Sequence, residues 1–107
     1  MKGRCVIMAR KNFIVISQTI EPENGMMYAV GFCGTFSTLK RALNAANAEI
    51  KEMGAPDEYA LLPSRRTTVI TTDENGKYSE DGAEFAIQIT LVETEVNRIY
   101  TNNDKLV

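Results

Sequence analysis

The fold is decided by residues 37–54, STLKRALNAANAEIKEMG, which carry the clearest helix pattern in the chain. Large or small apolar residues recur there at spacings of four, three, four and three, which places them on one face of an α-helix. Gly54 and Pro56 stop the pattern, so the helix should end near Met53. We expect Ser37 or Thr35 to cap its start. The buried stripe is predicted to consist of Leu39, Leu43, Ala46, Ile50 and Met53.

Two strands are predicted before this helix. Residues 13–20, FIVISQTI, are β-branched and aromatic, and both faces of the segment begin with apolar side chains, which favours a central strand. Residues 26–34, MMYAVGFCG, form the second strand. The turn sequence EPENG at 21–25 joins the two, so we predict a hairpin.

Two more strands are predicted after the helix, at residues 67–72 and 83–94. The last one alternates most regularly, with Phe85, Ile87, Ile89 and Leu91 on one face. The segment 67–72 is short and has no Lys or Pro, so we expect an edge strand that could pair with another chain. The connection between the helix and this strand should be anchored in the core by a short helical turn with Tyr59, Leu61 and Leu62.

The order strand–strand–helix–strand–strand predicts an α+β fold, a two-layer sandwich with one main helix packed on an antiparallel sheet of about four strands. The 107 residues should form a single domain. Residues 1–11 are expected to be a flexible arm or an extra strand, and residues 101–107 a frayed tail; the segment after Glu95 fits a helical turn or a strand continuation. The methionines Met26, Met27 and Met53 are expected in the core, and would add adaptable apolar contacts if exposed.

The stretch from Gly34 to Ala42, GTFSTLKRA, joins the second strand to the helix. It resembles the arm-binding, AP2-like modules of tyrosine recombinases, in which a G-x-F-x-T stretch also opens the helix. Those modules usually carry a strongly basic sheet, and this chain lacks one. The resemblance therefore extends to the fold and implies no activity.

Composition excludes several classes of function. The chain has no His, so it cannot build a Ser-His-Asp triad, a Cys-His dyad or an imidazole metal site. Its two cysteines, Cys5 and Cys33, are too few for a four-cysteine zinc site. We predict a non-enzymatic protein with no catalytic residue, no metal, no cofactor and no small-molecule substrate. Cys33 lies just before the helix, and an activated thiol there is the alternative that an enzyme would need.

The expected location is the cytoplasm. The longest apolar runs have four residues, far short of a membrane span. The basic and apolar residues at the start of the chain do not form a secretory signal, and two cysteines fit a protein with reduced thiols. We expect no contact with a membrane.

Charge is unevenly distributed along the chain, although the net charge is only −2. Residues 1–20 carry four basic residues and no acid, whereas residues 73–95 carry seven acids and one Lys. Opposite potentials speed and orient association, so the acidic segment predicts contact with a basic partner or with a neighbouring copy. The candidate protein-binding residues are Asp73, Glu74, Glu80 and Asp81.

The expected function is therefore protein–protein interaction or service as an assembly subunit, as in accessory proteins of phages and mobile elements. The alternative is a nucleic-acid-binding module that uses the basic N-terminal arm with Lys40, Arg41, Arg65 and Arg66, because phosphate binding needs clustered Lys and Arg. A third interpretation is that these charges only solvate the surface.

Overall fold

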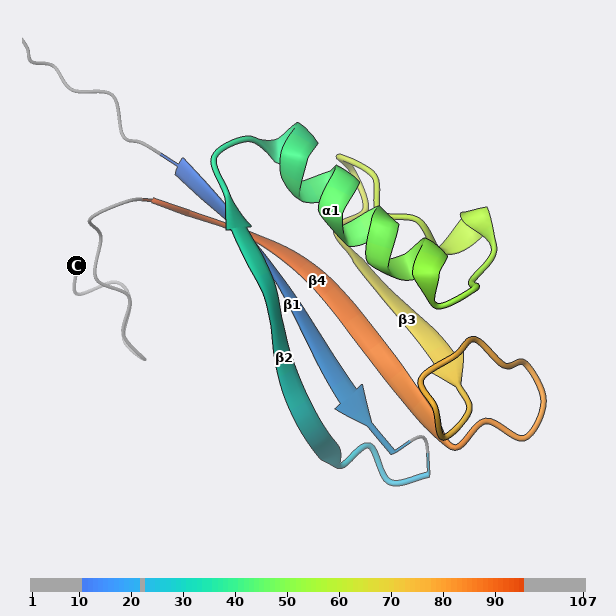
Figure 1. The fold of residues 1–107 in the computed structure, drawn as a ribbon. Coiled ribbons are helices and arrows are strands. Elements are labelled where there is room, and N and C mark those ends of the chain that lie inside the picture. Colours follow the sequence, from blue (N-terminus) through green and yellow to red (C-terminus); the bar gives the residue numbers. More distant parts are fainter. Residues whose placement is uncertain (1–10, 22, 96–107) are drawn as a thin grey trace, which may run out of the picture.

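The computed structural model describes residues 11–21 and 23–95, without the side chains of Tyr28, Phe32 and Cys33. It confirms the predicted α+β fold, in which one helix packs on an antiparallel sheet (Figure 1). The predicted arm and tail lie outside these residues, except that Lys11 belongs to the first strand. The elements are β1 (Lys11–Ile20), β2 (Met27–Phe36), α1 (Leu39–Glu52), the 3-10 turn η1 (Asp57–Tyr59), β3 (Thr67–Thr72) and β4 (Phe85–Glu95).

The four strands are ordered β2-β1-β4-β3, and all neighbours are antiparallel. The predictions of a central β1 and of an edge position for β3 are both confirmed. The outer edge of β3 is partly covered, because the Ser79 backbone N–H donates to the Thr71 carbonyl over 3.0 Å. In β2, Cys33 is the extra residue of a bulge: Val15 lies opposite Gly34, whereas Ile16 lies opposite Phe32.

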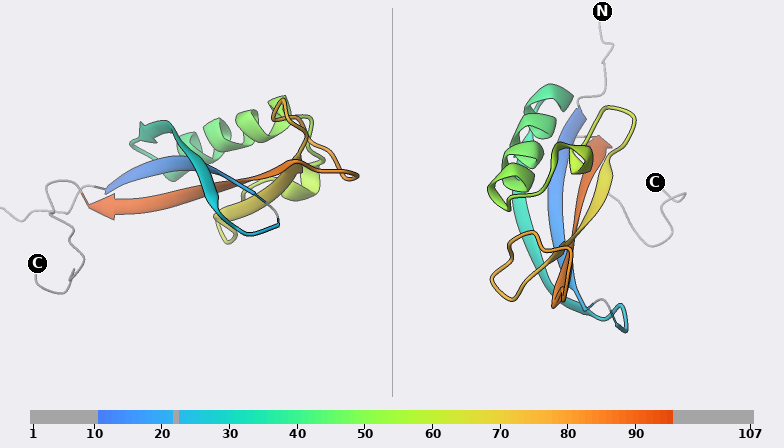
Figure 2. Two further views of the ribbon diagram at one scale, coloured as in Figure 1. Left: turned by 90° about the horizontal axis from the view of Figure 1, so that it is seen from below. Right: turned by 90° about the vertical axis from the view of Figure 1, so that its right-hand side faces the viewer.

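The core lies between α1 and one face of the sheet (Figure 2). Ala46 and Ile50 of the predicted stripe are buried, and Leu39, Leu43 and Met53 pack at its border. Ala42 is also fully buried, because a small side chain lets the helix approach the strands closely. The buried cluster comprises Phe13, Val15, Ala42, Ala46, Ile50, Leu61, Ile70, Ile89 and Leu91.

The observed N-cap of α1 lies one residue after Ser37 and three residues after Thr35, the two predicted caps. Thr38 is the N-cap, and its Oγ1 accepts a hydrogen bond from the Arg41 backbone N–H at 3.2 Å. The reason is that β2 continues to Phe36, which pairs with Phe13, so Thr35 is still part of the strand. At the other end the prediction is confirmed: Gly54 follows the helix with φ of +85°, a conformation that glycine adopts without strain.

Two predictions about apolar residues are wrong in part. Leu61 is buried at 1% exposure but Leu62 is 48% exposed, so only one of the two leucines anchors the connection. Met53 packs against the core as expected, whereas Met26 and Met27 are exposed at the tip of the first hairpin and the start of β2.

Candidate functional site

The sheet topology brings two acidic segments to the same end of the molecule. Ile20 at the end of β1 lies opposite Ala86 at the start of β4, and Thr72 at the end of β3 lies opposite Phe85. The β1–β2 turn and the β3–β4 loop are therefore neighbours (Figure 1). We call this region the acidic end; its carboxylates are Glu21, Glu23, Asp73, Glu74, Glu80, Asp81 and Glu84.

A surface pocket joins the two segments of the acidic end. It has a volume of about 320 Å³ and is lined by Glu21 and Glu23 from the turn and by Ala83, Glu84 and Phe85 from the loop and β4. Three carboxylates from distant parts of the sequence thus share one concave surface. Lys77 is the only basic residue in the two segments, so the acidic end carries a formal charge of −6.

The β3–β4 loop has a defined conformation, because its polar groups are bonded within the chain. The Asp73 carboxylate accepts hydrogen bonds from the backbone N–H groups of Asn75 at 2.8 Å and Lys77 at 3.0 Å. The Tyr78 N–H donates to the Met53 carbonyl, and Lys77 Nζ donates to the Glu52 carbonyl at 3.1 Å. These last two bonds tie the loop to the C-terminal end of α1.

Tyr78 fixes the middle of the loop against η1. Its ring centroid lies 5.6 Å from that of Tyr59, in a tilted arrangement. Burial raises the pKa of the Tyr78 hydroxyl above its ordinary value of 10, and hydrogen bonds with Glu80 and Tyr59 raise it further. Tyr78 therefore stays neutral at physiological pH and acts as a structural anchor of the loop.

The four predicted protein-binding residues divide into two pairs. Asp73 caps a turn and Glu80 is bonded to Tyr78, so both have a structural role. Glu74 and Asp81 are exposed to solvent. Sequence reasoning missed the part that Glu21, Glu23 and Glu84 play in this surface. The antiparallel pairing of the first and last strands is the signal that could have found them.

The four basic residues predicted to bind nucleic acid do not share one role in the structure. Lys40 and Arg41 are exposed in the first turn of α1. The Arg65 guanidinium donates to the carbonyls of Glu58 at 2.7 Å and Ala60 at 2.5 Å, and so holds the connection before β3. Arg66 donates to the Pro63 carbonyl at 3.1 Å through Nε. Two of the four predicted phosphate ligands are thus bonded to their own chain.

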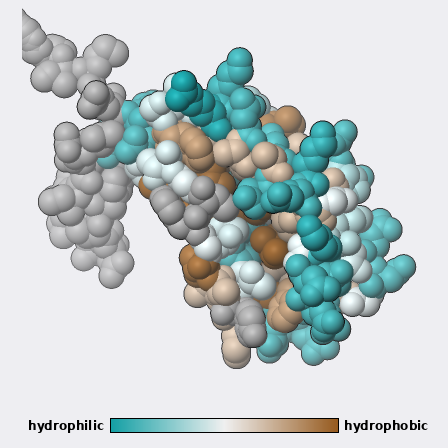
Figure 3. Space-filling model, viewed as in Figure 1, coloured by the Kyte–Doolittle hydropathy of each residue, from teal (hydrophilic) through white to brown (hydrophobic). Residues whose placement is uncertain are grey.

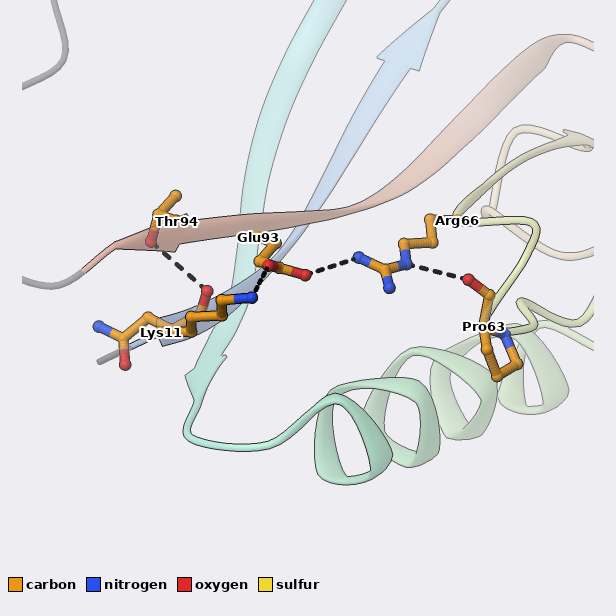
Figure 4. Close-up of polar contacts among 6 residues, drawn as sticks. Lys11, Pro63, Arg66, Glu93 and Thr94 are labelled. Atoms are coloured by element: carbon orange, nitrogen blue, oxygen red, sulfur yellow. Dashed lines mark hydrogen bonds and ion pairs between the residues drawn. The ribbon is translucent and has the colours of Figure 1, made fainter. Parts of the chain in front are cut away.

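Arg66 also belongs to an ion-pair network at the opposite end of the sheet (Figure 4). Glu93 on β4 lies 2.9 Å from Lys11 Nζ on β1 and 3.1 Å from Arg66 Nη1. The hydrogen bond from Lys11, followed by that from Arg66, lowers the pKa of Glu93 below its ordinary value of 4.5. The network clamps β1, β4 and the segment before β3 together.

A second pocket, of about 270 Å³, lies between the last turn of α1 and the β3–β4 loop. Glu49 and Glu52 line it from α1, and Lys77 lines it from the loop. On this side of the molecule, apolar surface is visible between the hydrophilic residues of the helix and those of the loop (Figure 3). The apolar part of the pocket lining consists of Met53, Ile87 and Ile89.

The described part of the chain offers no arrangement typical of a metal centre. Within residues 11–21 and 23–95, no group of three or more His, Cys, Asp or Glu side chains could hold a metal ion. The thiol of Cys33 lies outside the described side chains, so its activation stays a prediction. No helix among the described residues is long and apolar enough to cross a membrane.

Comparisons of the chain with protein-family models, with curated proteins and with solved structures gave no significant match. The resemblance of the Gly34–Ala42 stretch to AP2-like modules therefore gains no support from relatives.

Proposed function

We propose that the protein is a non-enzymatic assembly subunit, whose acidic end binds a basic surface of a protein partner. The observation that carries this proposal is the pocket in which Glu21, Glu23 and Glu84 meet. It extends the predicted acidic segment into a two-part surface built by both hairpin connections of the sheet.

The acidic end is preorganised for binding. The carboxylates lie on turns whose backbones are already hydrogen-bonded, so little conformational entropy is lost when a partner docks. Glu23, Glu74, Asp81 and Glu84 are exposed, which allows the long-range attraction of a basic patch. Such complementarity mainly raises the association rate and fixes orientation.

The proposal includes the cellular location and the class of protein. A cytoplasmic location is supported by the low cysteine content. A role as an accessory protein of a phage or mobile element rests only on how common small proteins without catalytic residues are in that class. Nucleic-acid binding through Lys40 and Arg41 is the competing function. The self-bonded guanidinium groups of Arg65 and Arg66 weigh against it.

The test compares two charge-neutralised variants with the wild type. The acidic-end variant carries Glu23→Gln, Glu74→Gln, Asp81→Asn and Glu84→Gln, and leaves the structural Asp73 and Glu80 in place. The control variant removes four exposed acids elsewhere, through Glu49→Gln, Glu52→Gln, Asp57→Asn and Glu58→Gln. Both variants change the net charge by the same amount.

Each immobilised protein is incubated with lysate of the source cells at low and at high salt, and captured proteins are quantified by mass spectrometry. We expect at least one protein to be captured by the wild type and the control but about tenfold less by the acidic-end variant at low salt. Equal capture by the two variants, or no specific capture at all, would reject the proposal. Nucleic acid that copurifies and is lost in Lys40→Ala/Arg41→Ala would instead support the competing function.

A further inference from the structure

The sheet has one face that no described helix covers. Phe13 and Val15 are buried beneath α1, so Ile14 and Ile16, which alternate with them, point to the other side. Figure 2 shows α1 on one side of the sheet only. Exposed fractions of 61% for Val30 on β2 and 48% for Val69 on β3 confirm that this side is open.

The composition of this open face is unusual for a solvated surface. Residues directly opposite each other on paired strands share a face, so the strand register identifies its members. They include Ile14, Ile16, Gln18, Ile20, Met27, Val30, Thr35, Thr67, Val69, Thr71, Ala86, Gln88, Thr90 and Val92, all at least partly exposed except Ala86, which is 5% exposed. None is charged; in a chain with 24% charged residues, a surface of this size would hold about three.

Several polar side chains of the open face are hydrogen-bonded within the chain. Thr67 Oγ1 lies 3.1 Å from Thr90 Oγ1 and accepts a hydrogen bond from Gln88 Nε2 at 3.4 Å. Thr71 Oγ1 donates to the Ser79 carbonyl at 2.7 Å. Because these groups already have partners, removing the face from water leaves few unsatisfied donors or acceptors.

We propose that the open face is the interface of a symmetric homodimer, in which the sheets of two copies pack face to face. A second copy fits because an uncharged surface is complementary to itself, which an isologous interface requires. Four strands spaced by about 4.8 Å, over about seven residues of 3.4 Å each, give roughly 450–500 Å² per copy. The total of roughly 900–1,000 Å² lies at the lower limit for a specific interface and fits a weak, reversible dimer.

Charge selects the orientation of the two copies. In an aligned sandwich the strands of the two sheets lie within about 30° of each other, so the acidic ends of the two copies lie either at the same end of the interface or at opposite ends. At the same end, two regions with a formal charge of −6 each would lie beside each other. At opposite ends they are separated, and each acidic end lies near the partner's Lys11–Glu93–Arg66 network.

This interface is a different surface from the acidic end, and the two proposals fail separately. The acidic-end variant should retain its dimer, and an obligate monomer could still capture a basic partner. The proposed dimer therefore adds a second copy of this chain as a partner. It does not depend on the binding of a basic protein at the acidic end.

The test is sedimentation equilibrium of the full-length chain from low to high micromolar concentration. We expect a concentration-dependent mass that approaches twice the 11.9 kDa of one chain. Val69→Glu and Val92→Glu each place two like charges in the interface, and should weaken association by about tenfold or more. Ala48→Glu, on the exposed side of α1, is the matched control and should leave association unchanged.

Each outcome decides the proposal. Circular dichroism checks that the variants fold, which is expected because Val69 and Val92 are exposed in the single chain. A wild type that stays monomeric overturns the proposal; if Val69→Glu also lowers its melting temperature, a segment of the same chain covers the face instead. A dimer that both Glu variants leave intact also overturns it, and would direct attention to pairing at the edge of β3.

Discussion

The side chain of Asn47 is predicted to contribute strongly to stability. It lies on α1, and its amide makes two hydrogen bonds to the backbone of Leu61. Asn47 Oδ1 accepts from the Leu61 N–H at 2.7 Å, and Asn47 Nδ2 donates to the Leu61 carbonyl at 3.0 Å. Since Leu61 is only 1% exposed, this pair of bonds fixes the segment before β3 against the helix.

Asn47→Ala would leave both backbone groups of Leu61 without their partner. A buried polar group left without its partner costs about 1–3 kcal/mol, so two cost roughly 2–6 kcal/mol. The higher helix propensity of Ala recovers about 0.5 kcal/mol. We expect a net loss of about 2–4 kcal/mol, because water reaches part of this half-buried site. For a domain of this size, that lowers the melting temperature by about 8 °C or more.

The assay is urea unfolding followed by circular dichroism at low protein concentration. Asn44→Ala, at an exposed position of the same helix, is the matched control and should change stability by no more than about 0.5 kcal/mol. Asn47→Asp keeps the acceptor for the Leu61 N–H but loses the donor, and should fall between the two. The reasoning is refuted if Asn47→Ala and Asn44→Ala have the same free energy of unfolding.

Two further predictions concern local interactions. Thr38→Ala removes the observed N-cap of α1 and should cost about 1 kcal/mol in urea unfolding, whereas Ser37→Ala should cost almost nothing; equal losses would show that the cap is assigned wrongly. The lowered pKa of Glu93 makes its ion pairs stabilising above pH 4.5, and this contribution is lost as the pH falls through the lowered pKa. The difference in the free energy of unfolding between wild type and Glu93→Gln should therefore be largest at neutral pH and disappear in strong acid. The prediction is contradicted if this difference does not change with pH, or if it is as small as the difference caused by the exposed control Glu58→Gln.

The elements of the fold were predictable because their signals are local. The spacing of apolar residues in α1, the EPENG turn and the alternation in β4 each depend on neighbours within a few residues. Errors arose where tertiary contacts decide. The strand β2 continues to Phe36 because Phe13 is opposite, and Leu61 rather than Leu62 is buried because Asn47 binds the Leu61 backbone.

The same distinction explains the partial prediction of the acidic end. The negative charge of residues 73–84 can be read from the sequence. That Glu84 lies beside Glu21 and Glu23 depends on the strand order β2-β1-β4-β3. If β3 rather than β4 lay beside β1, the β3–β4 loop would still reach this end of the sheet, but Glu84 would lie one strand farther from the turn. The pocket is thus a consequence of pairing between the first and last strands.

The apolar character of β1 has a second meaning that only the structure reveals. In the sequence, apolar side chains on both of its faces favour a central strand, and that position is confirmed. A central position means that both edges of β1 are paired with neighbouring strands. It does not bury the two faces of the strand, each of which needs another layer packed on it. The helix supplies that cover for Phe13 and Val15, whereas Ile14 and Ile16 share their face with the exposed Val30 and with other uncharged residues. A strand that is apolar on both faces, in a sheet of which the described helix covers only one face, therefore points to a second layer, which in the proposed homodimer is the sheet of the second copy.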